Sequence, residues 1–400
     1  MSFKIVLIIL IVLIALCSLL ITTVISIKLI QLNRERKRNI DTKNITPILN
    51  RLLADEKNTL PGDYKKDISK LADKLKDKIS LQTLENMLLD ILENAEGETE
   101  TRALAIAKHF KFPENCILMI RSRLSGNIAI GCRKAGLYKF SNAIPDIQKV
   151  LDILSSSIQL EALMALSRIG DTIALVQAFD KIHRLIFVNE RAINEIIRAF
   201  TGEQLELYKK MIFHKSDYLV RLFLKAIDKG TANKLIDDII LISQGGDKET
   251  RLACIIAIGR SGNREKVPAL IQAMSDKEWE IRAMAVKTLS VLTSPKAVMH
   301  IKKAACDREW WVRQNAVTTI LEYPDYEKNL ISIVKKGDRF AYENILYTLQ
   351  KTDKSEILPV ITEAWAKQAA GRERAGKRRK VSELSGKKSG NKNILEVQVQ

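Results

Sequence analysis

The sequence lacks the short motifs that mark most enzyme active sites. It contains no H-E-x-x-H pair, no Gly-rich phosphate loop and no G-x-S-x-G turn. Its histidines form no metal-binding pattern with one another or with a cysteine: His109, His183, His214 and His300. The sequence therefore predicts a non-catalytic protein with no catalytic, cofactor-binding or metal-binding residues.

Cysteines are few and unpaired. The chain has five, none of them in a C-x-x-C pair: Cys17, Cys116, Cys132, Cys254 and Cys306. An odd number at irregular spacing gives no sign of a disulfide framework and favours a reducing compartment. Isolated cysteines of this kind behave as small apolar side chains.

Aromatic residues make up only 6% of the chain, and alternation of apolar and polar residues is almost absent. Both observations predict an all-α protein. The net charge of +18 lies mainly at the ends: residues 1–32 carry +2, 33–43 carry +3 and 367–400 carry +7. The remaining +6 over 44–366 is an ordinary balance, which speaks against a basic groove for nucleic acid.

An uncharged run of 23 residues covers 5–27. At about 1.5 Å per residue it is long enough for a bilayer core of roughly 30 Å. A cleaved signal peptide is the alternative, but signal h-regions run to about 15 residues and end in a small-x-small site, which this run does not offer. We therefore expect a retained transmembrane helix.

The charges flanking this run predict its orientation. Lys4 alone precedes it, whereas six basic residues follow: Lys28, Arg34, Arg36, Lys37, Arg38 and Lys43. The positive-inside rule then places the C-terminal body in the cytoplasm, at the cell (inner) membrane. After this basic juxtamembrane linker over 28–44, Thr46 and Pro47 predict a helix start.

Residues of similar type recur about every 30 positions through the rest of the chain. This register is Ile128, Gln159, Arg191, Arg221, Arg251, Arg282, Arg313 and Tyr342. Three positions later come small residues: Gly131, Ala162, Cys254, Ala285 and Ala316. Seven positions later come apolar ones: Ala135, Leu166, Ile258, Leu289, Ile320 and Leu349. Such a period predicts stacked two-helix units.

Two repeats depart from this pattern, because Arg198 and Asp228 stand at the seventh position. For them we expect the apolar face to shift by one residue, to Ile197 and Ile227. The units before residue 127 are more degenerate. We expect a helical lead-in with capping repeats over 45–126 and the main array over 127–366.

The segments 276–289 and 307–320 share the order Asp, Trp, Ile or Val, Arg, Ala, Leu or Ile, and 267–271 reads Val-Pro-Ala-Leu-Ile. On these residues the chain resembles the HEAT-repeat family, specifically the short repeat of phycobilisome lyases and many bacterial proteins. The resemblance is strongest over 247–323. It implies an α-solenoid of HEAT-like two-helix repeats, similar to bacterial membrane-anchored HEAT proteins.

Two sets of residues in these repeats have a structural and a functional interpretation. Trp279, Trp310 and Trp311 pack on neighbouring turns in the first interpretation and stack on a ligand or base in the second. The second set is the pairs Asp276–Arg282 and Asp307–Arg313. We expect them to form a ladder, a series of Asp–Arg ion pairs that recurs from repeat to repeat and aligns the repeats, rather than an active site. Arg191, Arg221 and Arg251 are expected to extend it.

The composition changes at Lys367. Residues 367–400 are rich in Lys, Arg, Gly and Ser, which predicts a disordered basic tail. Its cluster Lys377, Arg378, Arg379 and Lys380 predicts contact with anionic lipid of the inner leaflet or with an acidic partner. A phosphate backbone and a purely solubilising role are the alternatives, and the terminal ILEVQVQ is either a frayed end or an added edge strand.

The leading hypothesis is a membrane-anchored scaffold that binds a partner protein through its repeats. The expected surface is Trp279, Arg282, Trp310, Trp311 and Arg313. An inner-membrane enzyme or an envelope-assembly component would suit it as partner. The alternatives are a nucleic-acid-binding or DNA-repair protein, and an enzyme of the bilin-lyase kind, which the repeat type alone suggests.

Overall fold

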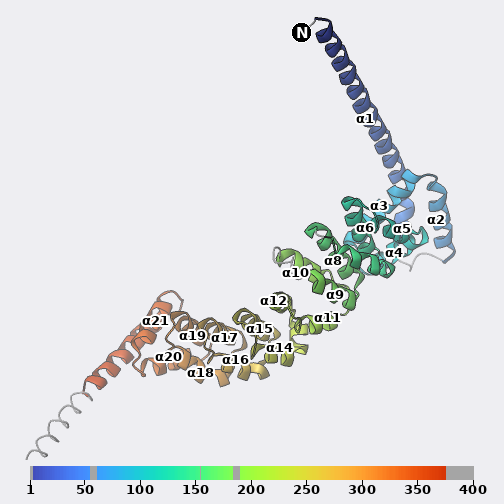
Figure 1. Cartoon of the computed structure of the whole chain (residues 1–400). Helices are drawn as coiled ribbons and strands as arrows, with labels where there is room; N and C mark the ends of the chain where they lie inside the picture. The colour runs from blue at the N-terminus through green and yellow to red at the C-terminus, as the bar shows by residue number, and fades with distance from the viewer. Residues whose placement is uncertain (1–2, 55–60, 154, 183–189, 375–400) are drawn as a thin grey trace, which may run out of the picture. The chain divides into compact units, whose positions relative to one another are not determined.

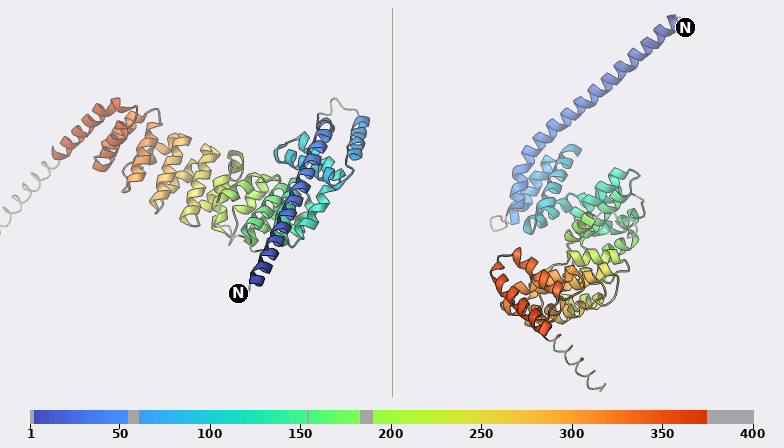
Figure 2. Two further views of the ribbon diagram at one scale, coloured as in Figure 1. Left: turned by 90° about the horizontal axis from the view of Figure 1, so that it is seen from above. Right: turned by 90° about the vertical axis from the view of Figure 1, so that its left-hand side faces the viewer.

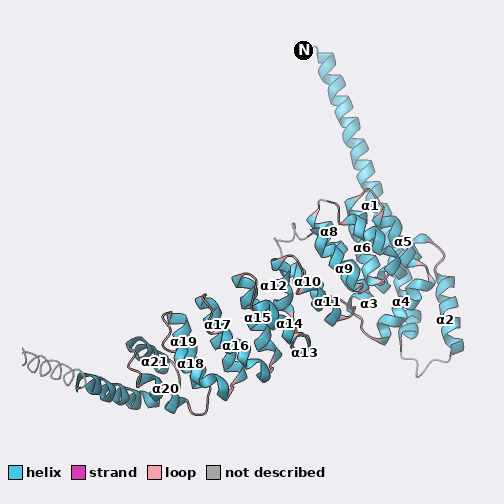
Figure 3. Ribbon diagram, turned by 60° about the horizontal axis from the view of Figure 1, so that its bottom comes forward, coloured by secondary structure: helices cyan, strands magenta, loops and turns pink. Residues whose placement is uncertain are grey.

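The computed structural model describes residues 3–54, 61–153, 155–182 and 190–374 (Figure 1). Every regular element in these ranges is an α-helix or a short 3-10 helix, and none of their residues forms a strand (Figure 3). The chain divides into two compact units, Met1–Gly202 and Glu203–Gln400. The prediction of an all-α protein is confirmed.

The first unit begins with a long helix and continues with shorter ones. Its helices are α1 (Phe3–Leu53), α2 (Pro61–Lys74), α3 (Lys78–Asn94), α4 (Glu98–His109), α5 (Phe112–Ile120), α6 (Ser125–Leu137), α7 (Ile144–Val150), α8 (Ser156–Ile169), α9 (Thr172–Ile182) and α10 (Glu190–Arg198). From α4 onward they alternate between first and second helices of two-helix repeats. The first helices α6 and α8 lie against each other, and α10 contacts α8.

Helix α1 is one unbroken element of 51 residues (Figures 1 and 2). It runs through Thr46 and Pro47, so the expected helix start there is wrong, and the linker expected over 28–44 is helical as well. Proline lacks the N–H that would bind the Lys43 carbonyl, yet the helix continues. Thr46 does not cap a new helix; its hydroxyl donates to the Thr42 carbonyl at 2.6 Å.

The end of α1 is held by the body of the first unit. Its residues Ile45, Ile48, Leu49 and Leu52 are buried, and α1 contacts α2, α3 and α4. Polar contacts begin further up the helix, where Lys37 pairs with Asp77 and the Ser80 hydroxyl lies 2.9 Å from an Asp41 carboxylate oxygen. The packing of the apolar residues explains why a proline does not end the helix.

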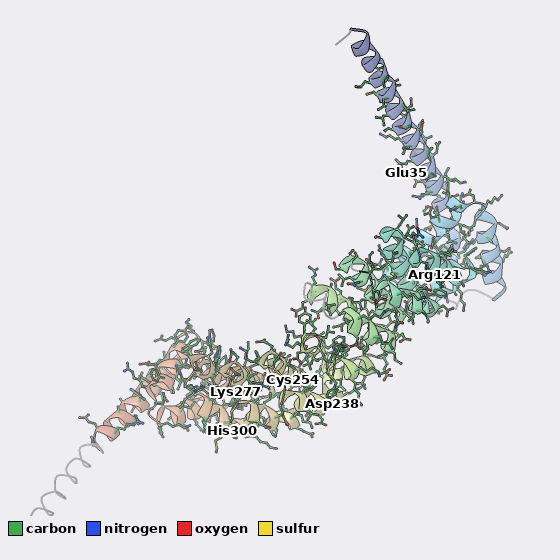
Figure 4. All side chains as sticks on the ribbon, in the orientation of Figure 1. Glu35, Arg121, Asp238, Cys254, Lys277 and His300 are labelled. Carbon is green, nitrogen blue, oxygen red and sulfur yellow. The ribbon has the colours of Figure 1, made fainter. Side chains whose placement is uncertain are left out.

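From Val12 to Leu32 the large apolar side chains of α1 are exposed. The segment Val12–Leu53 contains an 18-residue window with mean hydropathy of 2.4, and none of that window is buried. By length and composition, α1 is a helix able to cross a membrane. Figure 4 labels Glu35 on the part of α1 that follows this run.

The second unit repeats one pattern more regularly. Its helices are α11 (Gln204–Met211), α12 (Asp217–Ala226), α13 (Lys229–Lys234), α14 (Ile236–Ser243), α15 (Lys248–Ser261), α16 (Val267–Ala273), α17 (Trp279–Leu292), α18 (Val298–Ala304), α19 (Trp310–Leu321), α20 (Tyr326–Val334), α21 (Arg339–Gln350) and a last helix over 358–374. The first helices of its repeats, α12, α15, α17, α19 and α21, contact one another in chain order (Figure 1).

The predicted register is confirmed by these helices. Its eight residues lie in eight different first helices, from α6 to α21. The small and apolar residues three and seven positions later are all buried. In the two irregular repeats, Ile197 and Ile227 are buried while Arg198 and Asp228 are exposed, as the one-residue shift predicted. The fold is an α-solenoid of HEAT-like two-helix repeats that follows one long apolar helix.

The C-terminal boundary lies later than expected. Residues 367–374 continue the last helix, so the disorder expected from Lys367 is wrong for these residues. Arg372 holds the helix in place by donating to the carbonyls of Gly337 at 2.7 Å and Lys336 at 2.8 Å. Trp365 stacks on Tyr342, with ring centroids 4.4 Å apart.

Candidate interaction surface

Two neighbouring first helices of the second unit expose aromatic side chains. Helix α19 buries Val312, Ala316, Val317 and Ile320, a face at helical spacing. Trp310 and Trp311, in the first turn, point elsewhere and are 40% and 56% exposed. Large exposed aromatic side chains are uncommon on a soluble surface and are enriched where proteins bind one another.

Helix α21 adds two further rings. The Asp338 side chain caps this helix by accepting from the Ala341 amide at 2.9 Å. Its buried face, which includes Ala341, Ile345 and Leu349, leaves Phe340 63% exposed and Tyr347 41% exposed. We call the four residues Trp310, Trp311, Phe340 and Tyr347 the aromatic surface.

Three of these rings are in direct contact. The centroids of Trp310 and Trp311 lie 4.7 Å apart with an interplanar angle of 81°. Those of Trp310 and Tyr347 lie 6.1 Å apart at 71°. Edge-to-face contacts of this kind are favourable and hold the rings in fixed relative orientations. The surface is therefore preorganised, which lowers the entropy lost when a partner binds.

Cations already cover two of the rings. The Arg313 guanidinium lies 5.4 Å from the centroid of Phe340, and the Lys351 ammonium lies 4.2 Å from that of Tyr347. Lys351 also donates to the Tyr347 hydroxyl at 2.6 Å. These are cation–π contacts between adjacent repeats or along one helix.

Half of the aromatic surface, Trp310 and Trp311, was predicted from the sequence. The structure brings Trp310, Trp311 and Arg313 together, while Trp279 lies one repeat earlier at the start of α17 and is half-buried. Phe340 and Tyr347 were missed. Phe340 had a signal, because it precedes Tyr342 by two positions just as Trp311 precedes Arg313.

The arginine ladder is present, with different partners from those expected. Arg282 binds Asp307 through two hydrogen bonds of 2.8 Å each. Arg251 binds Asp276 at 3.2 Å, and Arg221 binds Asp247 at 2.6 Å. Each rung thus joins a register arginine to the aspartate that lies 25 or 26 residues later, in the turn before the next first helix.

The expected carboxylate pairs Asp276–Arg282 and Asp307–Arg313 are therefore wrong. Arg282 instead donates to the backbone carbonyls of Asp276 at 3.0 Å and Lys277 at 3.2 Å, and Lys277 is labelled in Figure 4. Arg313 binds the carbonyls of Asp307 and Arg308 in the same way, at 2.8 and 2.9 Å. The aspartate side chains accept from their own turns, for example from the Glu309 amide at 2.9 Å.

Arg191 does not belong to the ladder. Its side chain is 90% exposed and lies 3.5 Å from Glu195 of the same helix. Asp217 stands 26 positions later, the spacing of the Arg221–Asp247 rung, but it is the first residue of α12 and Ser216 takes the turn position before it. In the preceding repeat, Gln159 stands at the register position. Like Arg282 and Arg313, it donates to backbone carbonyls of the turn before its helix, those of Leu151 and Ile153, at 2.9 and 2.8 Å.

The Arg282–Asp307 rung is buried and charged. Burial raises the pKa of the Asp307 carboxyl, but the hydrogen bonds from Arg282 and from the Glu309 amide outweigh it and the net pKa is lowered. The same hydrogen bond raises the pKa of Arg282. Both groups stay ionised at neutral pH, so the rung aligns α17 with the turn before α19.

A pocket of about 520 Å³ lies between α14 and α16 of the second unit. Ile255 and Ile281 are among its apolar lining residues, and Ser243, Gln272 and Lys277 are among its polar ones. Arg251 also lines it but is already bound to Asp276 and to the Gly246 carbonyl. None of the aromatic surface contributes to this pocket.

Among the described residues, no group of three or more His, Cys, Asp and Glu could hold a metal ion. His183 and the basic cluster Lys377, Arg378, Arg379 and Lys380 lie outside the described residues, as does the terminal ILEVQVQ. The hypotheses attached to them stay predictions.

Comparison with known proteins bears on the repeats. The family model of HEAT repeats matches residues 236–322, which include α15 to α19. No curated protein matches the sequence. The chain therefore contains HEAT repeats where the arginine rungs are most regular.

Solved structures resemble the chain at low identity. Kap95p bound to RanGDP is 14% identical, with a TM-score of 0.38 over 84% of this chain and 55% of that one. The YibA protein of E. coli is 14% identical, with a TM-score of 0.32 over 71% and 94%. The CpcE–CpcF complex of phycocyanin lyase from Nostoc sp. PCC7120 is 14% identical, with a TM-score of 0.24 over 63% and 94%. Likenesses of this size carry no argument about activity or partners.

Proposed function

We propose that the protein is a non-catalytic scaffold, held at the bacterial inner membrane by α1, that binds a partner protein through the aromatic surface. The observation that carries this proposal is the exposure of four aromatic side chains on α19 and α21. Aromatic residues are scarce in this chain, yet four of them gather where each leaves 40% or more of its surface exposed. Such residues are the ones that contribute most to protein–protein affinity.

The apolar helix supplies the second part of the proposal. With α1 in the bilayer and basic residues after its apolar run, the repeats lie in the cytoplasm. Tethering raises the effective concentration of the scaffold for any partner at the same membrane. A membrane enzyme or an envelope-assembly component is the class of partner that gains most from this arrangement.

Site-specific photo-crosslinking in intact membranes tests the proposal. A benzoylphenylalanine at position 311 should give a discrete adduct with one protein. The matched control is the same probe at Met299, which is 75% exposed on the second helix α18 but lies outside the aromatic surface. The adduct from position 311 should be lost when Trp310 is replaced by alanine.

Two results would overturn this proposal. One is an adduct of equal yield from Met299 and from position 311. The other is the absence of any protein adduct at 311 in a chain whose thermal unfolding matches the parent.

Nucleic-acid binding is the second candidate, because exposed rings beside cations also stack bases. Filter binding of the full chain to single-stranded DNA at increasing salt distinguishes the two functions. Tight binding that falls steeply with salt and is lost in Trp311→Ala would favour this candidate. Weak binding that Trp311→Ala leaves unchanged would exclude the aromatic surface as its site.

A further inference from the structure

The aromatic surface has a charge preference as well as an apolar character. We propose that its occupant is an acidic segment of the partner protein that carries apolar side chains, and that cationic segments are excluded. This inference rests on the proposed function and names the chemistry of the partner at the same site.

The exclusion of cations follows from the two cation–π contacts. A cationic ligand binds an aromatic surface by lying over a free ring face. Here Arg313 already covers Phe340 at 5.4 Å and Lys351 covers Tyr347 at 4.2 Å. An incoming lysine or arginine would therefore meet a positive charge at both rings.

The preference for acidic groups follows from the residues that flank the rings. Arg308 and Arg339 have side chains that are 77% and 79% exposed. Together with Arg313 and Lys351 they place four cations around the aromatic surface. Three carboxylates lie beside them: Glu309, 3.8 Å from Arg308, Glu343, 2.7 Å from Arg339, and Asp338, which caps α21. Four cations against three carboxylates leave an excess of one positive charge.

The guanidinium of Arg313 also favours an acidic occupant. The buried Nε of Arg313 has no hydrogen-bond partner among the described residues, although its Nη1 is bound by two carbonyls. In the equivalent position of the preceding repeat, Arg282 uses its Nε to bind a carboxylate. Arg313 thus retains positive charge next to Phe340 that no carboxylate neutralises through hydrogen bonds in the described structure.

Charge alone does not describe the occupant. Trp311 and Phe340 are more than half exposed, and covering them with apolar side chains removes that surface from water. A segment with acidic side chains alone would leave the rings exposed to water. Complementary charge would add specificity and a faster association rate to the affinity that the rings provide.

Three synthetic peptides test this inference on the full chain in nanodiscs of phosphatidylcholine. Each has twelve residues with leucine at the same three positions, and the other nine are all Glu, all Gln or all Lys. Binding is followed by tryptophan fluorescence, which reports the repeats alone because the four tryptophans are Trp279, Trp310, Trp311 and Trp365.

We expect the Glu peptide to bind about tenfold more tightly than the Gln peptide, since surface ion pairs each contribute modestly, and the Lys peptide to bind least. The preference should shrink at high salt. Trp311→Ala should abolish binding of the Glu peptide, whereas Met299→Ala should leave it unchanged. Lys351→Met should narrow the gap between the Glu and Gln peptides.

Binding of the Lys peptide as tight as that of the Glu peptide would overturn the inference. So would a Glu preference that survives Trp311→Ala. A further experiment adds vesicles of phosphatidylglycerol in place of the peptide. A change in tryptophan fluorescence on this addition would show that the aromatic surface binds lipid instead of an acidic segment.

The outcomes separate this inference from the function it rests on. A protein adduct at position 311 whose cross-linked segment is basic refutes the acidic occupant and leaves the scaffold function standing. A Glu preference lost in Trp311→Ala, together with no protein adduct in membranes, supports the charge preference of the site and refutes the scaffold function.

Discussion

First helices approach closely at a glycine in both units, but those of the second unit are also joined to the next repeat by arginine rungs. In the first unit, Gly136 of α6 lies so close to α8 that an added Cβ would meet the Cα of Ala165 at 2.8 Å. In the second unit, Arg282 of α17 reaches Asp307 in the turn before α19. One contact depends on the absence of a side chain and the other on a long charged one.

This difference shows that the two-helix repeat fixes the distance between neighbouring first helices but not the type of side chain that joins them. Small residues let helices approach without any polar group to satisfy. A buried arginine requires a carboxylate and carbonyls at set positions, because an unpaired buried charge is costly. The second unit meets that requirement in three rungs, so its repeats are more alike in sequence than those of the first unit.

Breaking the strongest rung should have the largest effect. Replacing Arg282 by methionine leaves the Asp307 carboxylate without its ion-pair partner in a mostly buried site. We expect the free energy of unfolding to fall by about 3 kcal/mol, measured by urea denaturation and by hydrogen exchange of α17 and α19. Arg191→Met is the matched control, since that side chain is 90% exposed, and it should change stability by less than about 0.5 kcal/mol. Equal losses in both variants would contradict the ladder.

Filling the close contact in the first unit should have the next largest effect. Gly136→Ala places a Cβ against backbone atoms of α8, which cannot rotate away. We expect a loss of about 1–3 kcal/mol from overpacking, seen as faster hydrogen exchange in α6 and α8. Gly126→Ala, in the same helix but with no atom within 4 Å of its Cβ, should not destabilise the unit.

Acid should weaken both units over a similar range of pH for different reasons. The lowered pKa of Asp307 comes from Arg282 and turn amides acting against burial; the pKa of Asp77 is lowered to about 2, chiefly by the hydrogen bond from Lys37. A lowered folded-state pKa stabilises above the ordinary value of about 4 and is lost as pH falls through the folded value. Urea midpoints should therefore drop between about pH 4 and pH 2.

The variant Asp77→Asn separates the two contributions. It should flatten the acid dependence of α1 and α3, where Asp77 pairs with Lys37, and leave that of α17 and α19 unchanged. Hydrogen exchange measured segment by segment provides the comparison. An identical acid response of α3 in parent and variant would rule out this role for Asp77.

The smallest effect is expected where a close contact involves a side chain. A Cβ added at Gly259 of α15 would meet Cγ2 of Thr288 on α17. Unlike the backbone atoms facing Gly136, this methyl group can move when the threonine changes rotamer. The higher helix propensity of alanine offsets the remaining strain. Gly259→Ala should therefore change the urea midpoint little, and a loss as large as that of Gly136→Ala would show that Thr288 is fixed.

Much of the fold was predictable because the repeat places similar residues at similar depth. The small residues after each register position, and the one-residue shift to Ile197 and Ile227, followed from helical periodicity alone. The pairing of Arg282 with Asp307 did not, since sequence proximity favoured Asp276 and only the stacking of repeats brings Asp307 closer.

Other features depended on tertiary packing that no local pattern encodes. Pro47 signals a helix start by itself, but the buried residues around it keep α1 continuous. The last helix reaches residue 374 because Arg372 finds carbonyls in the turn at Gly337. Tyr347 joins the aromatic surface because α21 lies against α19, which the spacing of aromatic residues did not show.

The continuity of α1 couples the rotation of its two ends. An α-helix turns by about 100° and advances by about 1.5 Å for each residue. One residue inserted between Lys28 and Arg36 would therefore swing the first unit by roughly a quarter turn around the axis of the apolar run, with hardly any change in distance. The length of this segment therefore sets how the first unit is turned about the axis of the apolar run.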